Sequence, residues 1–136
     1  MCIRDSYCGQ RGCIETWLAG PALSSQFGDG AAPGEIARLA AQGDARAEAC
    51  LQRYEFRLAR GLATVINLLD PDVIVLGGGV SNLGRLYENL PALLPPFVFS
   101  DRCDTPIRPP VHGDSSGLRG AAWLWQESEV AEGLPR

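Results

Sequence analysis

The longest periodic stretch of apolar positions runs from Asp44 to about Leu69 and predicts one long helix. Asp44 is a good N-terminal cap, and Asp70-Pro71 ends the stretch because proline disfavours the helical conformation of the residue before it. Apolar side chains recur along it at spacings of three and four: Leu51, Tyr54, Leu58, Leu62, Val65, Ile66 and Leu69. Such a stripe is typical of a helix packed along one face.

An apolar run without alternation follows and predicts a buried central strand. Val73-Ile74-Val75-Leu76 is rich in β-branched residues, and Gly77-Gly78-Gly79 comes directly after it. Helical periodicity resumes between Leu83 and Leu94. Helix, strand, glycine turn and helix in this order indicate an α/β fold.

Weaker patterns predict shorter elements. We expect a strand or helical turn at 14–18, stopped by Gly20-Pro21, a brief helix at 35–41, and short strands at 97–99 and 106–108. A last helix is expected after a cap at Ser115 or Ser116, continuing to about residue 124.

Composition narrows the classes of function. The chain has 136 residues, 46% hydrophobic and 21% charged, which suits one globular unit with a single core. Its net charge of −4, its isoelectric point near 4.9 and the lack of a basic cluster argue against nucleic acid or an anionic membrane as partner. No secretory signal and no apolar run near the roughly 20 residues of a membrane span are recognisable. We therefore expect a cytoplasmic protein with a small ligand.

The glycine turn Gly77-Gly78-Gly79 has two interpretations. Glycine lacks a Cβ, so a flat or charged ligand can approach the main chain, and unpaired N–H groups at the start of the next helix favour phosphate or ribose. The spacing is not a dinucleotide fingerprint, because Asn82 takes the place of the third glycine, and it is not a P-loop. The alternative is a tight strand-to-helix turn that binds nothing.

The cysteines also leave two interpretations open. Cys8 and Cys13 are separated by four residues and each has a glycine neighbour, a spacing within the range of structural zinc sites. Zinc takes four ligands in such sites, and only two are evident here, with His112 far along the chain. The alternative is a pair of free thiols in a turn. The full set of cysteines is odd: Cys2, Cys8, Cys13, Cys50 and Cys103.

Three segments together resemble the ROK family of bacterial sugar kinases and repressors. Residues 6–16 read SYCGQRGCIET, similar to the family signature Cys-x-Cys-Gly-x-x-Gly-Cys-x-Glu. Residues 69–79 read LDPDVIVLGGG, similar to the adenosine-binding segment, and residues 112–125 read HGDSSGLRGAAWLW, similar to the end of the fructokinase branch. The resemblance extends from Tyr7 to Trp125 in family order.

The resemblance implies a function and a set of roles. It implies an ATP-dependent kinase that uses Mg²⁺ and transfers the γ-phosphoryl group to fructose or a related hexose. By position, Glu15 would bind the sugar hydroxyls, Cys8 and Cys13 would be zinc ligands, and Gly77, Gly78 and Gly79 would bind the nucleotide. The implied fold is the C-terminal lobe of the ribonuclease-H-like ATPases of the actin and hexokinase clan, and the full-length protein would be a homodimer.

The departures from the family pattern matter as well. Ser6 stands where the first cysteine belongs and the family's upstream histidine has no counterpart, so the zinc site is incomplete. The catalytic aspartate and the phosphate loops would lie upstream of Met1, so no catalytic residue is assigned in the chain. We divide the chain into a truncated or non-native start (1–6), a partial kinase domain (7–127, with the zinc knuckle at 8–13 and the adenosine segment at 73–82) and a tail (128–136).

The alternative from another class is the sugar-sensing domain of a ROK transcriptional repressor, which carries a similar cysteine loop behind a DNA-binding head. A helix-turn-helix upstream would decide for it. The glycine turn and the fructokinase-like ending favour the kinase. A stand-alone zinc-knuckle module would leave the adenosine-type segment unexplained.

Overall fold

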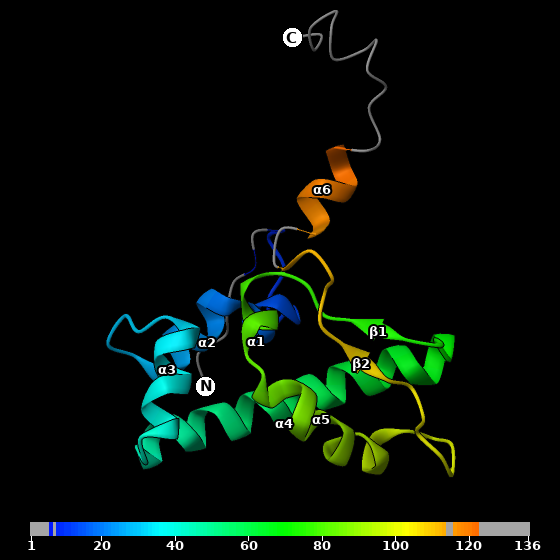
Figure 1. The fold of residues 1–136 in the computed structure, drawn as a ribbon, viewed down its shortest axis with the longest axis horizontal. Coiled ribbons are helices and arrows are strands. Elements are labelled where there is room, and N and C mark those ends of the chain that lie inside the picture. The colour runs from blue at the N-terminus through cyan, green and yellow to red at the C-terminus, as the bar shows by residue number, and fades with distance from the viewer. Residues whose placement is uncertain (1–5, 7, 114–115, 123–136) are drawn as a thin grey trace, which may run out of the picture.

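The computed structural model describes residues 6, 8–113 and 116–122 as a mixed α/β arrangement around one long helix, α4 (Figure 1). In chain order the elements are α1 (Glu15–Leu18), α2 (Gly20–Phe27), α3 (Pro33–Ala41), α4 (Ala45–Leu69), β1 (Ile74–Val75), a 3-10 helix (Gly79–Asn82), α5 (Arg85–Leu93), a 3-10 helix (Pro95–Phe97), β2 (Ile107–Arg108) and α6 (Ser116–Ala122). Figure 1 shows α1, α2 and α3 near the first half of α4, and α6 standing away from the other helices.

The long helix α4 confirms the prediction from the apolar stripe. The side chain of Asp44 caps it by accepting hydrogen bonds from the backbone N–H groups of Arg46 (2.8 Å) and Ala47 (2.9 Å). It ends at Leu69, and Asp70 takes a left-handed conformation with φ of 43° just before Pro71. Both ends of α4 are therefore set by local sequence.

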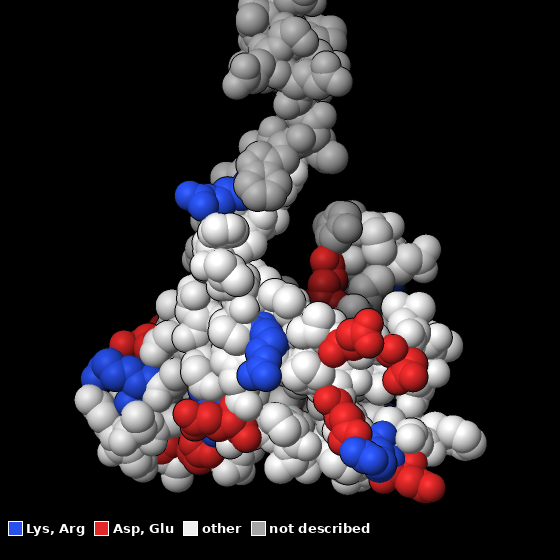
Figure 2. All heavy atoms as spheres, turned by 45° about the vertical axis from the view of Figure 1, so that its right-hand side comes forward, with Lys and Arg blue, Asp and Glu red and all other residues white. Residues whose placement is uncertain are grey.

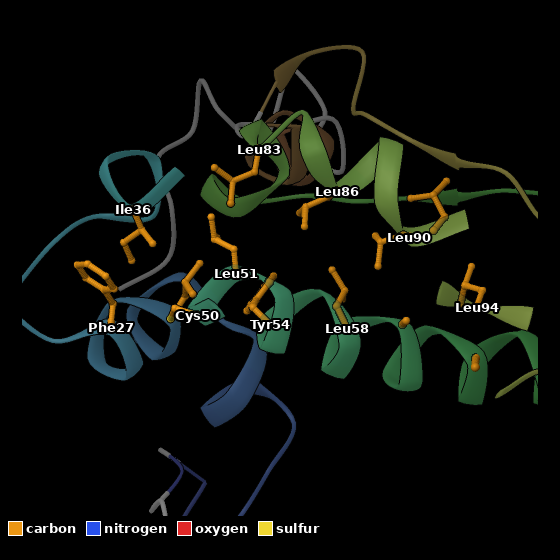
Figure 3. Packing of buried hydrophobic residues seen from close by; sticks show 14 of the residues in the cluster. Phe27, Ile36, Cys50, Leu51, Tyr54, Leu58, Leu83, Leu86, Leu90 and Leu94 are labelled. Atoms are coloured by element: carbon orange, nitrogen blue, oxygen red, sulfur yellow. The ribbon is translucent and has the colours of Figure 1, made fainter. Parts of the chain in front are cut away.

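The core lies on α4, which is covered by α5 and by buried residues of α2 and α3 such as Phe27 and Ile36 (Figure 3). Leu51, Tyr54 and Leu58 of the predicted stripe are buried there, with Leu86 and Leu90 of α5 across from them. Each fully buried leucine contributes about 1.5–3 kcal/mol relative to exposure, so this core is a large source of stability. The predicted helix at 83–94 is confirmed as α5.

The prediction that the whole apolar stripe packs is wrong at the C-terminal end of α4. Val65 is 40% exposed and Leu69 is 73% exposed, although both were predicted to pack. Among the described residues, no element covers this side of the last turns of α4. Apolar spacing fixes which side chains share a face, but burial also needs a neighbour across from that face.

The predicted central strand is also only partly right. β1 pairs in parallel with β2, with Ile74 opposite Ile107, and these are the only strands in the described part of the chain. Val73 and Val75 are 46% and 56% exposed, so β1 is not buried on both faces. Its inner positions contact the core and its outer positions face solvent, the alternation expected of a sheet covered on one side.

The predictions of the shorter elements were partly right. Residues 14–18 form a helical turn, 35–41 lie within α3, and 106–108 contain β2, but 97–99 form no strand. The element at 14–18 ends before Gly20-Pro21, as predicted. Gly20-Pro21 also starts the unpredicted helix α2, because proline suits the first turn, where its missing N–H has no partner to lose. Ser116 begins α6, whereas Ser115 and residues 123–124 lie outside the described residues.

The surface carries mixed charge. Figure 2 shows acidic side chains in several groups on one face, with basic side chains between and beside them. Within the described residues, no helix combines the length and apolar character that a bilayer crossing requires.

Candidate functional site

The cysteine loop brings its two thiols together, as its spacing predicted. Cys8 Sγ and Cys13 Sγ lie 3.6 Å apart. Gly9 and Gly12 have φ values of +80° and +73°, a left-handed conformation that glycine adopts without strain. Two sulfurs bound to one tetrahedral zinc at about 2.3 Å would lie about 3.8 Å apart, so the pair has the spacing of one edge of such a site.

The described residues provide only part of the ligands of a structural zinc ion. Among the described residues, no group of three or more His, Cys, Asp or Glu side chains converges on one point. His112 is exposed and its Nδ1 lies 3.3 Å from an Nη atom of Arg119, and Cys2 lies outside the described residues. A structural zinc site needs four ligands, and the described loop provides two. The other two have to come from elsewhere if zinc binds at all.

Ser6 stands in the place where the family signature has its first cysteine, and it is buried. Its Oγ lies 3.3 Å from Cys8 Sγ. The side chain of Ser6 also donates a hydrogen bond of 2.7 Å to Oε1 of Glu15.

Glu15, the predicted sugar-binding residue, begins the short helix α1. The helix is held against α4 at Gly61, where an added Cβ would lie 3.0 Å from Ile14 Cδ1 and 3.3 Å from Leu18 Cδ1. Glycine at this position lets the two helices approach closely. The other end of α1 is tied down by Tyr54, whose hydroxyl donates to the Leu18 carbonyl at 2.8 Å. Burial raises the pKa of Tyr54 to about 12, so this donor keeps its proton at neutral pH.

The glycine turn is open to ligands. Gly77, Gly78 and Gly79 are exposed, and a Cβ added at any of them would meet nothing within 4 Å. Gly78 has φ of 77° and ψ of 176°, a conformation essentially restricted to glycine. The turn lines a pocket of about 360 Å³ together with Leu18, Ala19 and Gly20 at the junction of α1 and α2. The structure thus brings the glycine turn beside the helix that begins with Glu15.

Two residues that the sequence did not single out hold this turn. Ser81 Oγ donates to the Gly78 carbonyl at 2.6 Å, and the Tyr87 hydroxyl donates to the Ser81 carbonyl at 2.7 Å. Tyr87 lies within the helix predicted at 83–94, and it was assigned no role beyond that. A hydroxyl on a largely apolar helix face, eight residues after a glycine run, is the one signal that would have pointed to it.

The helix that follows the glycine turn begins where the sequence predicted it, within 83–94. A 3-10 helix (Gly79–Asn82) lies between the turn and α5, which begins at Arg85. The N–H groups near the turn are therefore those of the 3-10 helix. A larger hollow of about 560 Å³ lies elsewhere, at the end of α4 around Asp70 and Asp104, and none of the predicted site residues lines it.

Two solved sugar kinases have the same arrangement. The chain superposes on a ROK hexokinase from Thermus thermophilus with a TM-score of 0.73 at 32% identity, covering 96% of this chain and 45% of that one. It superposes on a ROK glucokinase from Streptomyces griseus, solved with glucose and AMPPNP, with a TM-score of 0.72 at 27% identity, covering 88% of this chain and 47% of that one. The fold is that of the ROK sugar kinases.

The sequence comparison gives the family. The model of the ROK family matches residues 3–128, and the chain belongs to that family. It is 38% identical over 130 residues to an N-acetyl-D-glucosamine kinase of Salmonella paratyphi B, and 36% identical over 122 residues to one of Haemophilus influenzae. These alignments cover 90% and 87% of this chain but 42% and 40% of the relatives. The chain thus spans about two fifths of the length of these relatives.

A ROK transcriptional regulator shares the fold as well. It superposes with a TM-score of 0.59 at 23% identity over 71% of this chain and 28% of that one. At this identity the likeness concerns the fold alone.

Proposed function

We propose that the chain forms the C-terminal lobe of an ATP-dependent hexose kinase and that Glu15 and the glycine turn are its binding groups. The observation that carries the proposal is that Glu15 and the glycine turn belong to segments that meet at one pocket. Glu15 begins α1, and Leu18, which ends α1, lines the same pocket as Gly77, Gly78 and Gly79. The names of the relatives, N-acetyl-D-glucosamine kinase, glucokinase and hexokinase, support phosphoryl transfer to a hexose.

The proposed roles follow from the chemistry of each group. The Glu15 carboxylate accepts hydrogen bonds from hexose hydroxyls, and because α1 is packed against α4, little ordering cost remains at binding. The glycine turn takes the adenosine part of ATP along its bare backbone. Bound Mg²⁺ would neutralise phosphate charge during the transfer. We assign no residue of this chain as the base that activates the sugar hydroxyl.

The acceptor sugar is a finer proposal. The resemblance of the C-terminal segment points to fructose, whereas the relatives are named for N-acetylglucosamine, glucose and hexose. We propose that the preferred phosphoryl acceptor is an aldohexose of the glucose or N-acetylglucosamine type, and that fructose is the second candidate. A cytoplasmic location and a homodimeric full-length protein belong to the same proposal.

The test is an acceptor panel with the full-length protein that contains these 136 residues. ADP release would be measured with N-acetylglucosamine, glucose, mannose and fructose, each with and without ATP, and with a non-sugar polyol as the blank. We expect ATP-dependent turnover with at least one hexose. Tight hexose binding without turnover, together with sugar-dependent binding of specific DNA, would contradict the kinase and support the repressor.

A further inference from the structure

The helix that carries Glu15 is too short to hold its own shape. α1 has four residues, whereas an isolated helix of fewer than about 12 residues is barely stable in water. The last carbonyl groups of a helix also have no partner inside it. In α1 the Leu18 carbonyl accepts from the Tyr54 hydroxyl of α4 at 2.8 Å. The Trp17 carbonyl accepts from Nε2 of Gln26 in α2 at 3.1 Å, so the position of α1 depends on contacts with other helices.

Arg57 of α4 joins two of these contacts. Its guanidinium carbon lies 4.7 Å from the centre of the Trp17 ring, within the range of a cation–π contact. Its Nη1 donates a hydrogen bond to Oε1 of Gln26. All three residues are half-buried. Arg57 thus contacts the ring of Trp17 directly and holds the Trp17 carbonyl through Gln26.

The direction of these hydrogen bonds follows from what each group can do. A guanidinium only donates, so it binds the oxygen end of the Gln26 amide. The nitrogen end then faces the Trp17 carbonyl, which can only accept. Arg57 therefore selects the one orientation of the Gln26 amide that caps α1.

These polar contacts set the rotation of α1, which apolar packing alone leaves free. Gly61, one turn after Arg57 on α4, contacts Ile14 and Leu18, and such apolar contacts are not directional. Successive residues of a helix are turned by about 100°, so Glu15 and Trp17 leave α1 about 200° apart. Holding Trp17 against α4 therefore points the Glu15 side chain away from α4.

We propose that Arg57 is a positioning residue for the Glu15 carboxylate and that it fixes the rotation of α1 before the hexose binds. The inference rests on the proposed sugar-binding role of Glu15. Without Arg57, α1 samples other orientations, and the apparent hexose affinity falls by the fraction of molecules that keep the competent one. The ATP KM should change little, because Leu18 keeps its hydrogen bond from Tyr54.

The experiment uses the full-length protein that contains these 136 residues, with Arg57→Met, Arg57→Lys and Gln26→Met. Arg53→Met is the matched control, because Arg53 is an exposed arginine one turn earlier on α4. Affinity for N-acetylglucosamine and for glucose would be measured by calorimetry. We expect Arg57→Met to weaken hexose binding about tenfold, since it loses both the cation–π contact and the hydrogen bond. Arg57→Lys should recover part of the affinity because it keeps the charge and a donor, and Arg53→Met should stay within about twofold of the wild type.

Hydrogen exchange in the unliganded protein gives a readout that needs no sugar. In Arg57→Met the backbone amides of residues 16–19 should exchange faster, while those in the middle of α4 keep their wild-type rates. A role in general stability alone would instead speed exchange in α1 and α4 together, and that result would count against the proposal.

A double variant tests whether Arg57 acts through Glu15. Arg57→Met should add little to the loss caused by Glu15→Gln, because the carboxylate that it positions is then already absent. Additive losses overturn the proposal, and so does wild-type hexose affinity in a folded Arg57→Met protein. If Arg57→Met does not fold, Gln26→Met decides in the same way.

The same variants separate this proposal from the proposed function. Weaker hexose binding in Glu15→Gln with wild-type binding in Arg57→Met overturns the role of Arg57 alone. Wild-type hexose binding in Glu15→Gln overturns the binding role of Glu15, and the positioning role of Arg57 falls with it.

Discussion

Arg85, in the first turn of α5, places its Nε 2.5 Å from Oε1 of Glu55 in the middle of α4. The side chain of Glu55 is 3% exposed and that of Arg85 is 22% exposed. The same guanidinium donates to both oxygens of Glu48 at 2.8 and 2.9 Å, and Asn89 donates to Oε2 of Glu55 at 3.1 Å. Since the helix that follows the glycine turn begins at Arg85, this cluster anchors the turn to α4.

Removing the cation should therefore destabilise the protein strongly. In Arg85→Met the buried Glu55 carboxylate loses its counter-ion, and breaking such a buried pair from one side costs about 3–5 kcal/mol. Denaturant unfolding of this chain would measure the loss. Replacing Glu55 with Met as well should recover a large part of it, because no buried charge is left unpaired and Glu48, which also loses Arg85, has a side chain that is 38% exposed.

The matched control is Arg38→Ala. Arg38 pairs with Glu35 on the surface, with side chains 53% and 44% exposed, and should contribute at most about 1 kcal/mol. Equal losses of unfolding free energy for Arg85→Met and Arg38→Ala would contradict the larger contribution expected of the buried pair.

The Glu48–Arg85 pair should make part of the stability depend on pH. The hydrogen bond from Arg85 holds the pKa of Glu48 below its usual value of 4.5. A carboxylate whose folded pKa is depressed stabilises the fold above its unfolded pKa, and this contribution is lost as the pH falls through the folded pKa. Unfolding free energies of wild type and Glu48→Gln should differ at pH 7 and converge as the pH falls below 4.5 and through the folded pKa of Glu48. A difference that is the same at both pH values would contradict this.

The sequence predicted what is local and periodic. Asp44 as cap, the length of α4 and the convergence of Cys8 with Cys13 all follow from residue types at short spacing. Burial of Val75 could not be predicted in this way, because it depends on which element lies across from the strand. The helix α2 was missed because proline at its start was taken as a stop signal.

The sequence named the residues of the candidate site but not the contacts between them. The roles of Glu15 and the glycine turn came from the resemblance. The pocket that the glycine turn shares with Leu18, at the end of α1, depends on how α1 packs on Gly61. The Ser6–Glu15 hydrogen bond joins residues nine positions apart through the shape of a loop. Neither contact leaves a periodic signal, since each depends on three-dimensional packing between segments.

The glycine turn should tolerate alanine at one position and not at its neighbour. Gly78 has φ of 77° and ψ of 176°, so Gly78→Ala should cost about 1–3 kcal/mol of stability and raise the ATP KM. Gly77 has no left-handed φ and no atom near an added Cβ, so Gly77→Ala should change stability by less than about 0.5 kcal/mol. Thermal unfolding of both variants tests the difference, and equal losses would contradict the observed conformation.

The central claim is that Glu15 binds the hexose from the first turn of α1. Its most direct test is the steady-state kinetics of Glu15→Gln in the full-length protein, with Glu35→Gln, an exposed glutamate of α3, as control. Losing the charged carboxylate as hydrogen-bond acceptor should lower kcat/KM for hexose about 10- to 100-fold, while the ATP KM stays within about twofold of the wild-type value. A Glu15→Gln protein that phosphorylates hexose with wild-type kcat/KM would contradict the account.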